Sequence, residues 1–382
     1  MSGSMQSLES IVVIGAGIVG LSCAIELADR DLRVSLFDKT WPPRGASWAA
    51  AGMLAPAFEA ASTPGTHPKL FALCDQSAQV WPVWSAALED RTGLSSGYRP
   101  GPSLAVAIDS VQANDLAAIE RAMRGHRQAP DRCVVNSNSI DPAISGAVKT
   151  ALLLPSDGQV DNRRTLAALV ACAETHPNIT IHRGEAPLHA RGRQIDHAGH
   201  DATLVCAGWR TAKVQAEEGD PSFTLASLDP VLDDIRSYGG QMLSVAPIEG
   251  APKMTIRCGA LYIVPKQDRI VIGATTEPGR VLQETDAEVI ADLKARAAEI
   301  CPVLADAEIL ESWAGVRPGT KDHAPILGET QVPKLFVASG HYRNGILLAP
   351  ITAQIMADLI VDGKMTDLAQ TFSPQARLAA QV

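Results

Sequence analysis

Residues 11–20 read IVVIGAGIVG, and this stretch decides the fold of the chain. Its first four residues are apolar and β-branched, which predicts a buried parallel strand. Three glycines follow with GxGxxG spacing, helical spacing continues to Arg30, and residues 32–37 (LRVSLF) predict a second strand. Asp38 stands 18 residues after the last glycine. A strand, glycine turn, helix and second strand that ends in an acid are the pattern of a dinucleotide-binding unit.

Each residue of this motif has a physical task. Gly15 permits the tight turn, Gly17 lets the backbone approach a pyrophosphate, and Gly20 lets the helix pack on the strand. Asp38 can accept hydrogen bonds from a ribose. The alternative is an ordinary βαβ unit without a ligand.

A second informative stretch, residues 339–350, reads SGHYRNGILLAP. It joins an apolar strand at 335–339 to an apolar helical pattern at 346–360, and its turn carries four hydrogen-bonding side chains, His341 to Asn344. A helix N-terminus presents free N–H groups and partial positive charge, and Arg343 adds a planar fork suited to a carboxylate. The turn therefore predicts an anion site.

Between these stretches the pattern changes. Residues 44–56 (RGASWAAAGMLAP) are mostly small, so this loop could lie flat against a planar ligand. Residues 57–68 suggest a mobile surface segment, a candidate lid. Helical spacing from 69 to 92 places Trp81 and Trp84 on one face, as core residues.

The second half of the chain contains a group of short apolar strands and a helix. Apolar strands at 241–245, 261–264 and 270–272, separated by Pro and Gly, predict an antiparallel sheet built on insertions between α/β segments. A helix is expected at 286–300. We therefore expect a Rossmann-like α/β unit with a second, mostly antiparallel substrate domain, and hence an α+β chain overall.

Composition excludes several classes of function. Of 382 residues, 46% are hydrophobic and 20% charged, which indicates a globular protein, and the net charge of −9 argues against nucleic-acid binding. Seven cysteines without CxxC pairs fit reduced thiols, and no His/Cys pair has ligand spacing, so we expect no metal. The N-terminus lacks a signal-peptide pattern, which favours a soluble, cytoplasmic protein without a membrane span.

Six motifs together resemble one family. They are GAGIVG at 15–20, GASWAAAGMLAP at 45–56, YIVPK at 262–266, IGAT at 272–275, WAGVRPGT at 313–320 followed by Asp322 and Pro325, and GHYRNGILLAP at 340–350. The chain resembles the D-amino-acid-oxidase-type FAD-dependent oxidoreductases, nearly end to end. Within them it is most similar to the glycine oxidases of bacterial thiamine synthesis.

The resemblance implies a division of the chain. Residues 1–82, 151–212 and 313–372 would form the FAD-binding domain, 83–150 and 213–312 the substrate domain, and 373–382 a tail. It also implies a homotetramer. No cysteine lies in 313–325, where a related group links its flavin, so the FAD is expected to be noncovalent.

The resemblance further implies residue roles. Arg317 would pair with the substrate carboxylate, Tyr262 would donate a phenolic hydrogen bond, Arg343 would lie at the same site, and Met53 would bound the pocket. For Arg317 the alternative is a buried ion pair with Asp322. The expected cofactor-binding residues are Gly15, Ala16, Gly17, Ile18, Val19, Gly20, Asp38, Lys39, Ala46, Ser47, Ala49, Ala50, Gly52, Met53, Val160, Ala207, Gly208, Trp209, His341, Tyr342, Arg343, Asn344, Gly345 and Ile346.

No residue is expected to act as a catalytic base. Hydride can pass directly from an amine carbon to flavin N5, so the protein's task is alignment and exclusion of water. His341 is interpreted as a structural hydrogen bonder, and Lys266 and Arg269 as solvated charges at a sheet edge. The expected products from glycine and O2 are glyoxylate, ammonia and hydrogen peroxide.

Three alternatives remain open at this point. The enzyme could be a dehydrogenase of the same fold that passes electrons to a quinone or a protein, an oxidase of sarcosine or a D-amino acid, or a noncatalytic FAD-binding subunit. One departure from the family pattern bears on the pocket. Gly239 stands where the family usually has arginine before Gly-Gln.

Overall fold

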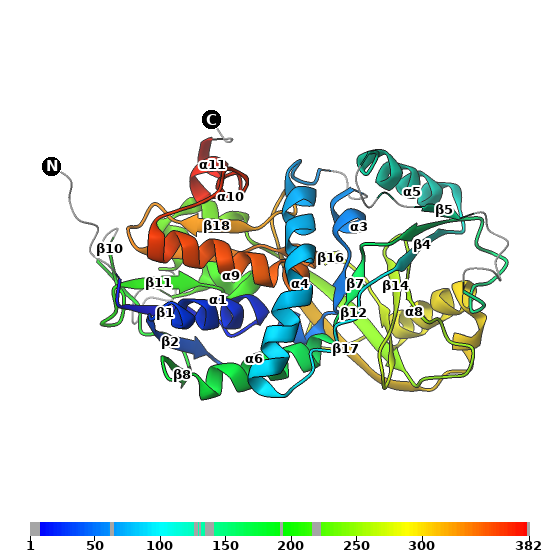
Figure 1. Ribbon diagram of the computed structural model, residues 1–382, viewed down its shortest axis with the longest axis horizontal. Helices are drawn as coiled ribbons and strands as arrows, with labels where there is room; N and C mark the ends of the chain where they lie inside the picture. The colour runs from blue at the N-terminus through cyan, green and yellow to red at the C-terminus, as the bar shows by residue number, and fades with distance from the viewer. Residues whose placement is uncertain are drawn as a thin grey trace.

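The computed structural model describes residues 8–61, 65–125, 129, 131–133, 141–191, 194–215 and 223–379. Figure 1 shows two sheets in separate halves of the molecule, with the long helix α4 (Leu70–Thr92) between them. This arrangement confirms the expected α/β unit with a second, mostly antiparallel sheet.

The first sheet contains the glycine motif. Its strand order is β18-β19-β11-β1-β2-β8, and every neighbouring pair is parallel except β18 with β19. The central strand β1 (Ser10–Ile14) is buried throughout because its β-branched residues are covered on both faces. The others are β2 (Arg33–Asp38), β8 (Ile179–Arg183), β11 (Ala202–Val205), β18 (Ile326–Glu329) and β19 (Leu335–Ser339).

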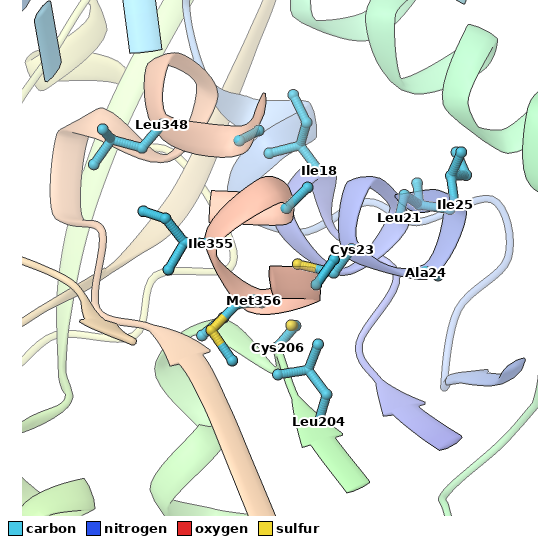
Figure 2. Packing of buried hydrophobic residues seen from close by; sticks show 14 of the residues in the cluster. Ile18, Leu21, Cys23, Ala24, Ile25, Leu204, Cys206, Leu348, Ile355 and Met356 are labelled. Atoms are coloured by element: carbon cyan, nitrogen blue, oxygen red, sulfur yellow. The ribbon is translucent and has the colours of Figure 1, made fainter. Parts of the chain in front are cut away.

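Apolar helices cover one face of this sheet. The helix α1 (Ile18–Asp29) packs against α9 (Gly345–Asp362) and α6 (Asn162–Thr175). Figure 2 shows Ile18, Leu21 and Cys23 of α1 gathered with Ile355 and Met356 of α9 above the strands. The segment Tyr342–Asp362 is long and apolar enough to cross a membrane, but 67% of its most apolar window is buried inside the protein, as in a core helix.

The second sheet has the order β16-β12-β15-β14-β13-β4-β6-β5, and β17 pairs with the other edge of β12. Only β13 with β4 is parallel. The helix α8 (Ala287–Ile300) shares its apolar core, and α3 (Pro56–Ala61) packs with α5 (Ser110–Ala122). The strands are β4 (Ser103–Ala107), β5 (Asp131–Cys133), β6 (Thr150–Leu154), β12 (Arg236–Val245), β13 (Thr255–Cys258), β14 (Leu261–Pro265), β15 (Ile270–Gly273), β16 (Glu277–Pro278) and β17 (Ile309–Gly319).

Short elements complete the chain. Two small ribbons pair β3 (Met53–Leu54) with β7 (Gly158–Gln159) and β9 (His189–Arg191) with β10 (Gln194–Asp196). The remaining helices are α2 (Ala46–Ala49), α7 (Leu225–Leu228), α10 (Asp367–Gln370) and α11 (Pro374–Ala379), and the 3₁₀ turns are η1 (Gly208–Lys213), η2 (Pro230–Asp234), η3 (Pro302–Ala305) and η4 (Tyr342–Asn344).

Strand pairing corrects the expected division at three places. The strand β6 pairs with β4, so the chain leaves the second sheet after Leu154 and not at residue 150. The whole of β17 pairs with β12, so the return to the first sheet follows Gly319 and not residue 312. Residues of α7 and η2 pack on β1 and β19, so the second insertion begins near Arg236 and not at 213. With these boundaries the two-domain division remains a proposal.

The expected mobile lid at 57–68 is wrong in its first part. Residues 56–61 form α3, where Ala57 and Phe58 are buried. The small and apolar residues of this stretch fill space between α4 and α5, which pattern alone did not indicate. Residues 62–64 lie outside the described part of the chain.

Candidate functional site

One cavity of about 800 Å³ collects most of the predicted site residues. It runs from the glycine motif of the first sheet to β12, β14 and β17 of the second. Lining residues therefore come from segments that are far apart in the sequence. A partly apolar cavity with a few convergent polar groups is the expected form of a cofactor and substrate site.

The glycine motif forms a cradle at one end. Gly15 has a φ of +99°, and a Cβ there would lie 2.5 Å from the carbonyl oxygen of Cys206. A Cβ on Gly20 would lie 1.8 Å from the carbonyl oxygen of Gly15, so the helix can sit this close only without a side chain. Gly17 faces open space apart from Ser47 Oγ. The cradle thus fits a pyrophosphate on backbone groups.

The N-terminus of α1 is electrostatically free for that anion. Its N-cap residue, Gly17, offers no capping side chain, and no acidic residue stands in the first turn. The Ile18 amide donates to Ser47 Oγ at 3.0 Å, which ties the small-residue loop to the helix. The partial positive charge of the helix is therefore available to a ligand.

Asp38 lines the cavity and also braces the glycine turn. Its carboxylate accepts hydrogen bonds from the Ala16 amide (2.7 Å) and from the Thr40 amide (2.9 Å) and hydroxyl (3.2 Å). A carboxylate has about four acceptor sites, so one more bond is possible. The predicted contact with a ribose stays a prediction.

The small-residue loop is pinned from both sides. Asn162 Nδ2 donates to the carbonyls of Ser47 (2.9 Å) and Trp48 (2.8 Å), and Trp313 Nε1 donates to Ala49 O at 2.9 Å. A Cβ on Gly315 would lie 2.6 Å from Ala49 Cβ, so β17 approaches the loop closely. These bonds hold the small-residue loop in place as one wall of the cavity.

Arg317 of β17 is the main candidate for binding an anion at the other end of the cavity. It lines the cavity, and protein encloses it closely enough that burial lowers the pKa of its guanidinium. Its Nη1 donates hydrogen bonds to two backbone carbonyl oxygens, Thr275 O at 3.2 Å and Gly239 O at 3.5 Å. Asp322, the alternative partner, pairs instead with Arg377 at 3.0 Å. Within the described residues Arg317 has no carboxylate partner of its own.

Tyr262 stands beside this arginine. The residue is 4% exposed, it lines the cavity, and its phenol lies within hydrogen-bonding reach of Arg317. Burial raises the pKa of the phenol, against the opposing charge of Arg317, so the group stays a proton donor. Met242 belongs to the same apolar cluster as Tyr262, Met53 packs against this cluster, and both methionines line the cavity.

Arg343 also lines the cavity, but its first partner is a residue that sequence reasoning missed. Its Nε lies 2.8 Å from Glu59 Oε2, and the other oxygen of Glu59 lies 2.5 Å from a terminal nitrogen of Arg257. Burial alone would raise the pKa of Glu59, yet the charges of Arg257 and Arg343 outweigh it and lower the pKa to about 2. No spacing signal in the sequence links these three residues.

The turn before α9 combines structural and cavity-lining roles. His341 is buried, its Nε2 lies 3.1 Å from Thr352 Oγ1, and burial lowers its pKa to about 3, so the ring is neutral near pH 7. Tyr342 has a φ of +51° and stacks on His323 with ring centroids 4.6 Å apart. Gly345 and Ile346 face the cavity from the first turn of α9.

Five predicted residues do not line the cavity, namely Ala16, Gly20, Gly52, Val160 and Asn344. Most of them support its wall. The Val160 amide donates to Gly52 O at 2.8 Å, and a Cβ on Gly52 would lie 2.2 Å from Val160 O. The other predicted cofactor-binding and substrate-binding residues all line it.

The structure adds lining residues that were not among the predicted site residues. Some fall inside the quoted motifs, and the others lie in segments where sequence pattern carries no signal of proximity. The added residues are Ile14, Phe37, Thr40, Pro43, Arg44, Gly45, Ala51, Gly184, Glu185, Ala186, Cys206, Arg210, Lys213, Val214, Gln215, Met242, Gly315, Val316, Pro318, Ala338 and Ser339.

The interpretation of Lys266 and Arg269 as solvated charges is wrong. Lys266 Nζ donates to Val160 O, and burial lowers the pKa of this lysine to about 7. Arg269 is 11% exposed and lies 3.0 Å from Asp161. Lys266 therefore contacts the segment that follows β7, and Arg269 pairs with the N-cap residue of α6.

Comparisons with known proteins match the chain to one family. The family model described as FAD dependent oxidoreductase matches residues 10–359. The bifunctional protein ThiO/ThiG of Trichormus variabilis is 34% identical over 378 residues, which cover 95% of this chain and 54% of that protein. The chain thus spans about half the length of that relative.

Relatives of similar length to this chain match over most of their length. The glycine oxidase of Geobacillus kaustophilus is 32% identical over 362 residues, which cover 92% of each chain. Its crystal structure is similar with a TM-score of 0.83 and covers 95% of this chain and 97% of that one at 31% identity. An iminodiacetate oxidase from Chelativorans sp. shares the fold, at 22% identity and a TM-score of 0.81, with coverage of 95% of this chain and 98% of that one.

Proposed function

The chain belongs to the family of FAD-dependent oxidoreductases, and from that premise we propose that it is an oxidase of glycine or of a similar small amine or D-amino acid. The observation that carries the proposal is Arg317, a cavity-lining guanidinium without a carboxylate partner among the described residues. A half-buried cation of this kind, without a carboxylate partner, favours binding of an anion, and a substrate carboxylate fits its planar fork.

The cavity fits FAD at its glycine-motif end. The cradle at Gly15 and Gly17 and the N-terminus of α1 would hold the pyrophosphate, and Ser47, Ala49 and the first turn of α9 would face the ring system. When bound, FAD would supply the hydride acceptor and, after that, the electrons for O2 reduction. No cysteine lies in residues 313–325, and we propose noncovalent binding.

The protein's own groups align and enclose the substrate. Arg317 binds the carboxylate through two parallel N–H donors, and Tyr262 adds a phenolic hydrogen bond. Met53 and Met242 limit the length of the side chain that fits and keep water out. His341 is neutral and tied to Thr352, so it does not take a proton from the amine.

Anaerobic addition of glycine, sarcosine and D-alanine in turn to the flavin-loaded protein tests the proposal. We expect loss of the oxidised flavin absorbance with at least one of the three. If none bleaches the flavin, the substrate assignment fails. Peroxide formation in air then separates an oxidase from a dehydrogenase that uses a quinone or protein acceptor.

We further propose a role in supplying thiamine thiazole synthesis, a homotetramer and a cytoplasmic location. The first is supported by the ThiO/ThiG relative, and the others rest on the family resemblance and composition. Size-exclusion chromatography with light scattering tests the oligomeric state.

A further inference from the structure

A buried ion cluster lies directly behind the substrate end of the cavity. It consists of Glu59, Arg257 and Arg343, which we call the Glu59 cluster. The side chains of these residues are 8%, 0% and 14% exposed. The cluster is thus shielded from solvent, where a single charge has a large effect on its neighbours.

The cluster joins three separate elements. Glu59 comes from α3, which lies between α4 and α5 (Figure 1). Arg257 is on β13 opposite Tyr262 of β14, with its guanidinium 3.7 Å from the ring centre of Phe58. Arg343 comes from the turn before α9 and is the member that lines the cavity.

The cations of this region outnumber its anions. Arg317, Arg343 and Arg257 all act on the Tyr262 phenol, and all three oppose the rise of its pKa. The negative charge that balances part of this positive charge is Glu59, whose pKa is lowered by Arg257 and Arg343 so that it stays ionised. The other nearby acid, Asp157, accepts from Ser103 Oγ at 2.5 Å, and burial raises its pKa to about 7.

Arg257 is not fully satisfied by this pairing. Its Nε and second terminal nitrogen are buried, and neither has a hydrogen-bond partner among the described residues. Glu59 therefore shares one negative charge between two arginines, and one of these arginines, Arg343, lines the cavity. Without Glu59, Arg343 would offer a second carboxylate site next to Arg317.

We propose that Glu59 is a specificity-determining residue that acts as a built-in carboxylate. It neutralises the second anion site, so the pocket takes small amino acids with one carboxylate and rejects dicarboxylic ones. Glu59 acts here through Arg343. The inference rests on the proposed function, because it concerns the same pocket.

The proposal is tested by comparing the binding of a ligand with one carboxylate and a ligand with two. Dissociation constants of acetate and malonate are measured from the flavin absorbance change of the holoenzyme, for the native protein and Glu59→Gln. The substitution keeps the shape of the side chain and removes its charge. We expect the preference for malonate over acetate to rise at least tenfold, and the ratio of kcat/KM for iminodiacetate over glycine to rise with it.

A matched double variant separates charge from packing. Glu59→Gln combined with Arg257→Gln restores the native net charge, and its malonate-to-acetate preference should return to within about threefold of the native value. Arg257→Gln alone should lower the preference for malonate over acetate. This variant tests the proposed charge effect if Glu59→Gln does not fold.

Two results would overturn the inference. One is an unchanged malonate-to-acetate preference in Glu59→Gln, and the other is a double variant that keeps the raised preference. Failure of the proposed function would look different. Glycine, sarcosine and D-alanine would then all leave the flavin oxidised, while the two dissociation constants could still be compared.

Discussion

Replacing Arg317 by alanine should remove substrate binding and leave FAD binding intact. In the structure the guanidinium bonds to backbone carbonyls at 3.2 and 3.5 Å and has no described carboxylate partner, so its fork is available to a substrate. Truncating one partner of a buried, hydrogen-bonded charge pair costs about 2–5 kcal/mol. At about 1.4 kcal/mol per tenfold, kcat/KM for glycine should fall by about 30-fold to 4000-fold.

The assay is steady-state peroxide production over a range of glycine concentrations, with the flavin-to-protein absorbance ratio as a check on cofactor content. Most of the loss should enter KM, because the clamp holds the carboxylate in both ground state and transition state. Arg317→Lys keeps the charge but not the planar fork, so it should recover only part of the loss.

Arg91→Ala serves as the matched arginine control. Arg91 pairs with Asp29 at 2.7 Å on the surface, and neither residue lines the cavity. A surface ion pair contributes at most about 1 kcal/mol to stability. Its kinetics should stay within twofold of native. If Arg317→Ala keeps its flavin and changes kcat/KM by less than threefold, the carboxylate clamp is wrongly assigned.

Three further outcomes follow from the geometry. Gly20→Ala should give little flavin-loaded protein, because its Cβ would lie 1.8 Å from a carbonyl oxygen. Gly146→Ala, whose Cβ meets nothing within 4 Å and which does not line the cavity, should bind FAD normally, and flavin content after purification decides this. His341→Gln should leave the shape of the kcat/KM pH profile between pH 6 and 9 unchanged, because the ring is already neutral with a pKa of about 3, and a lost inflection would contradict this. The pKa of Glu59 is lowered from 4.5 to about 2, so its contribution to stability is complete above pH 4.5 and is lost as pH falls toward 2. Urea unfolding should therefore show that the native protein loses about 2 kcal/mol more than Glu59→Gln between pH 5 and pH 3, and equal losses would refute the ion pairs.

The sequence predicted the first sheet well because its signals are local. The run at 11–14, the glycine spacing and Asp38 each depend on neighbours within a few residues, and the structure places them as β1, the cradle and the end of β2. Helix patterns at 69–92 and 286–300 were similarly close to α4 and α8. Periodicity reports which face of an element is buried, so it survives into the fold.

Sequence pattern failed where the partner of a residue lies in another element. The stretch at 57–61 seemed a surface lid, yet its apolar residues fill a gap between two helices. Lys266 and Arg269 were predicted to be solvated. In the structure Lys266 donates a hydrogen bond to Val160 O and Arg269 forms an ion pair with Asp161. No local rule states which loop will cover a strand end.

The sequence by itself therefore determined the nucleotide-binding unit, the mixed architecture and, through resemblance, Arg317 and Tyr262 as substrate ligands to be tested. Only the tertiary structure decided that Asp322 pairs with Arg377, which leaves Arg317 open to the cavity, and that Glu59 pairs with Arg343. The reason is physical. Turns and helices are set by contacts between near neighbours, whereas the charge in a pocket is the sum over side chains that meet only after the two sheets have packed together.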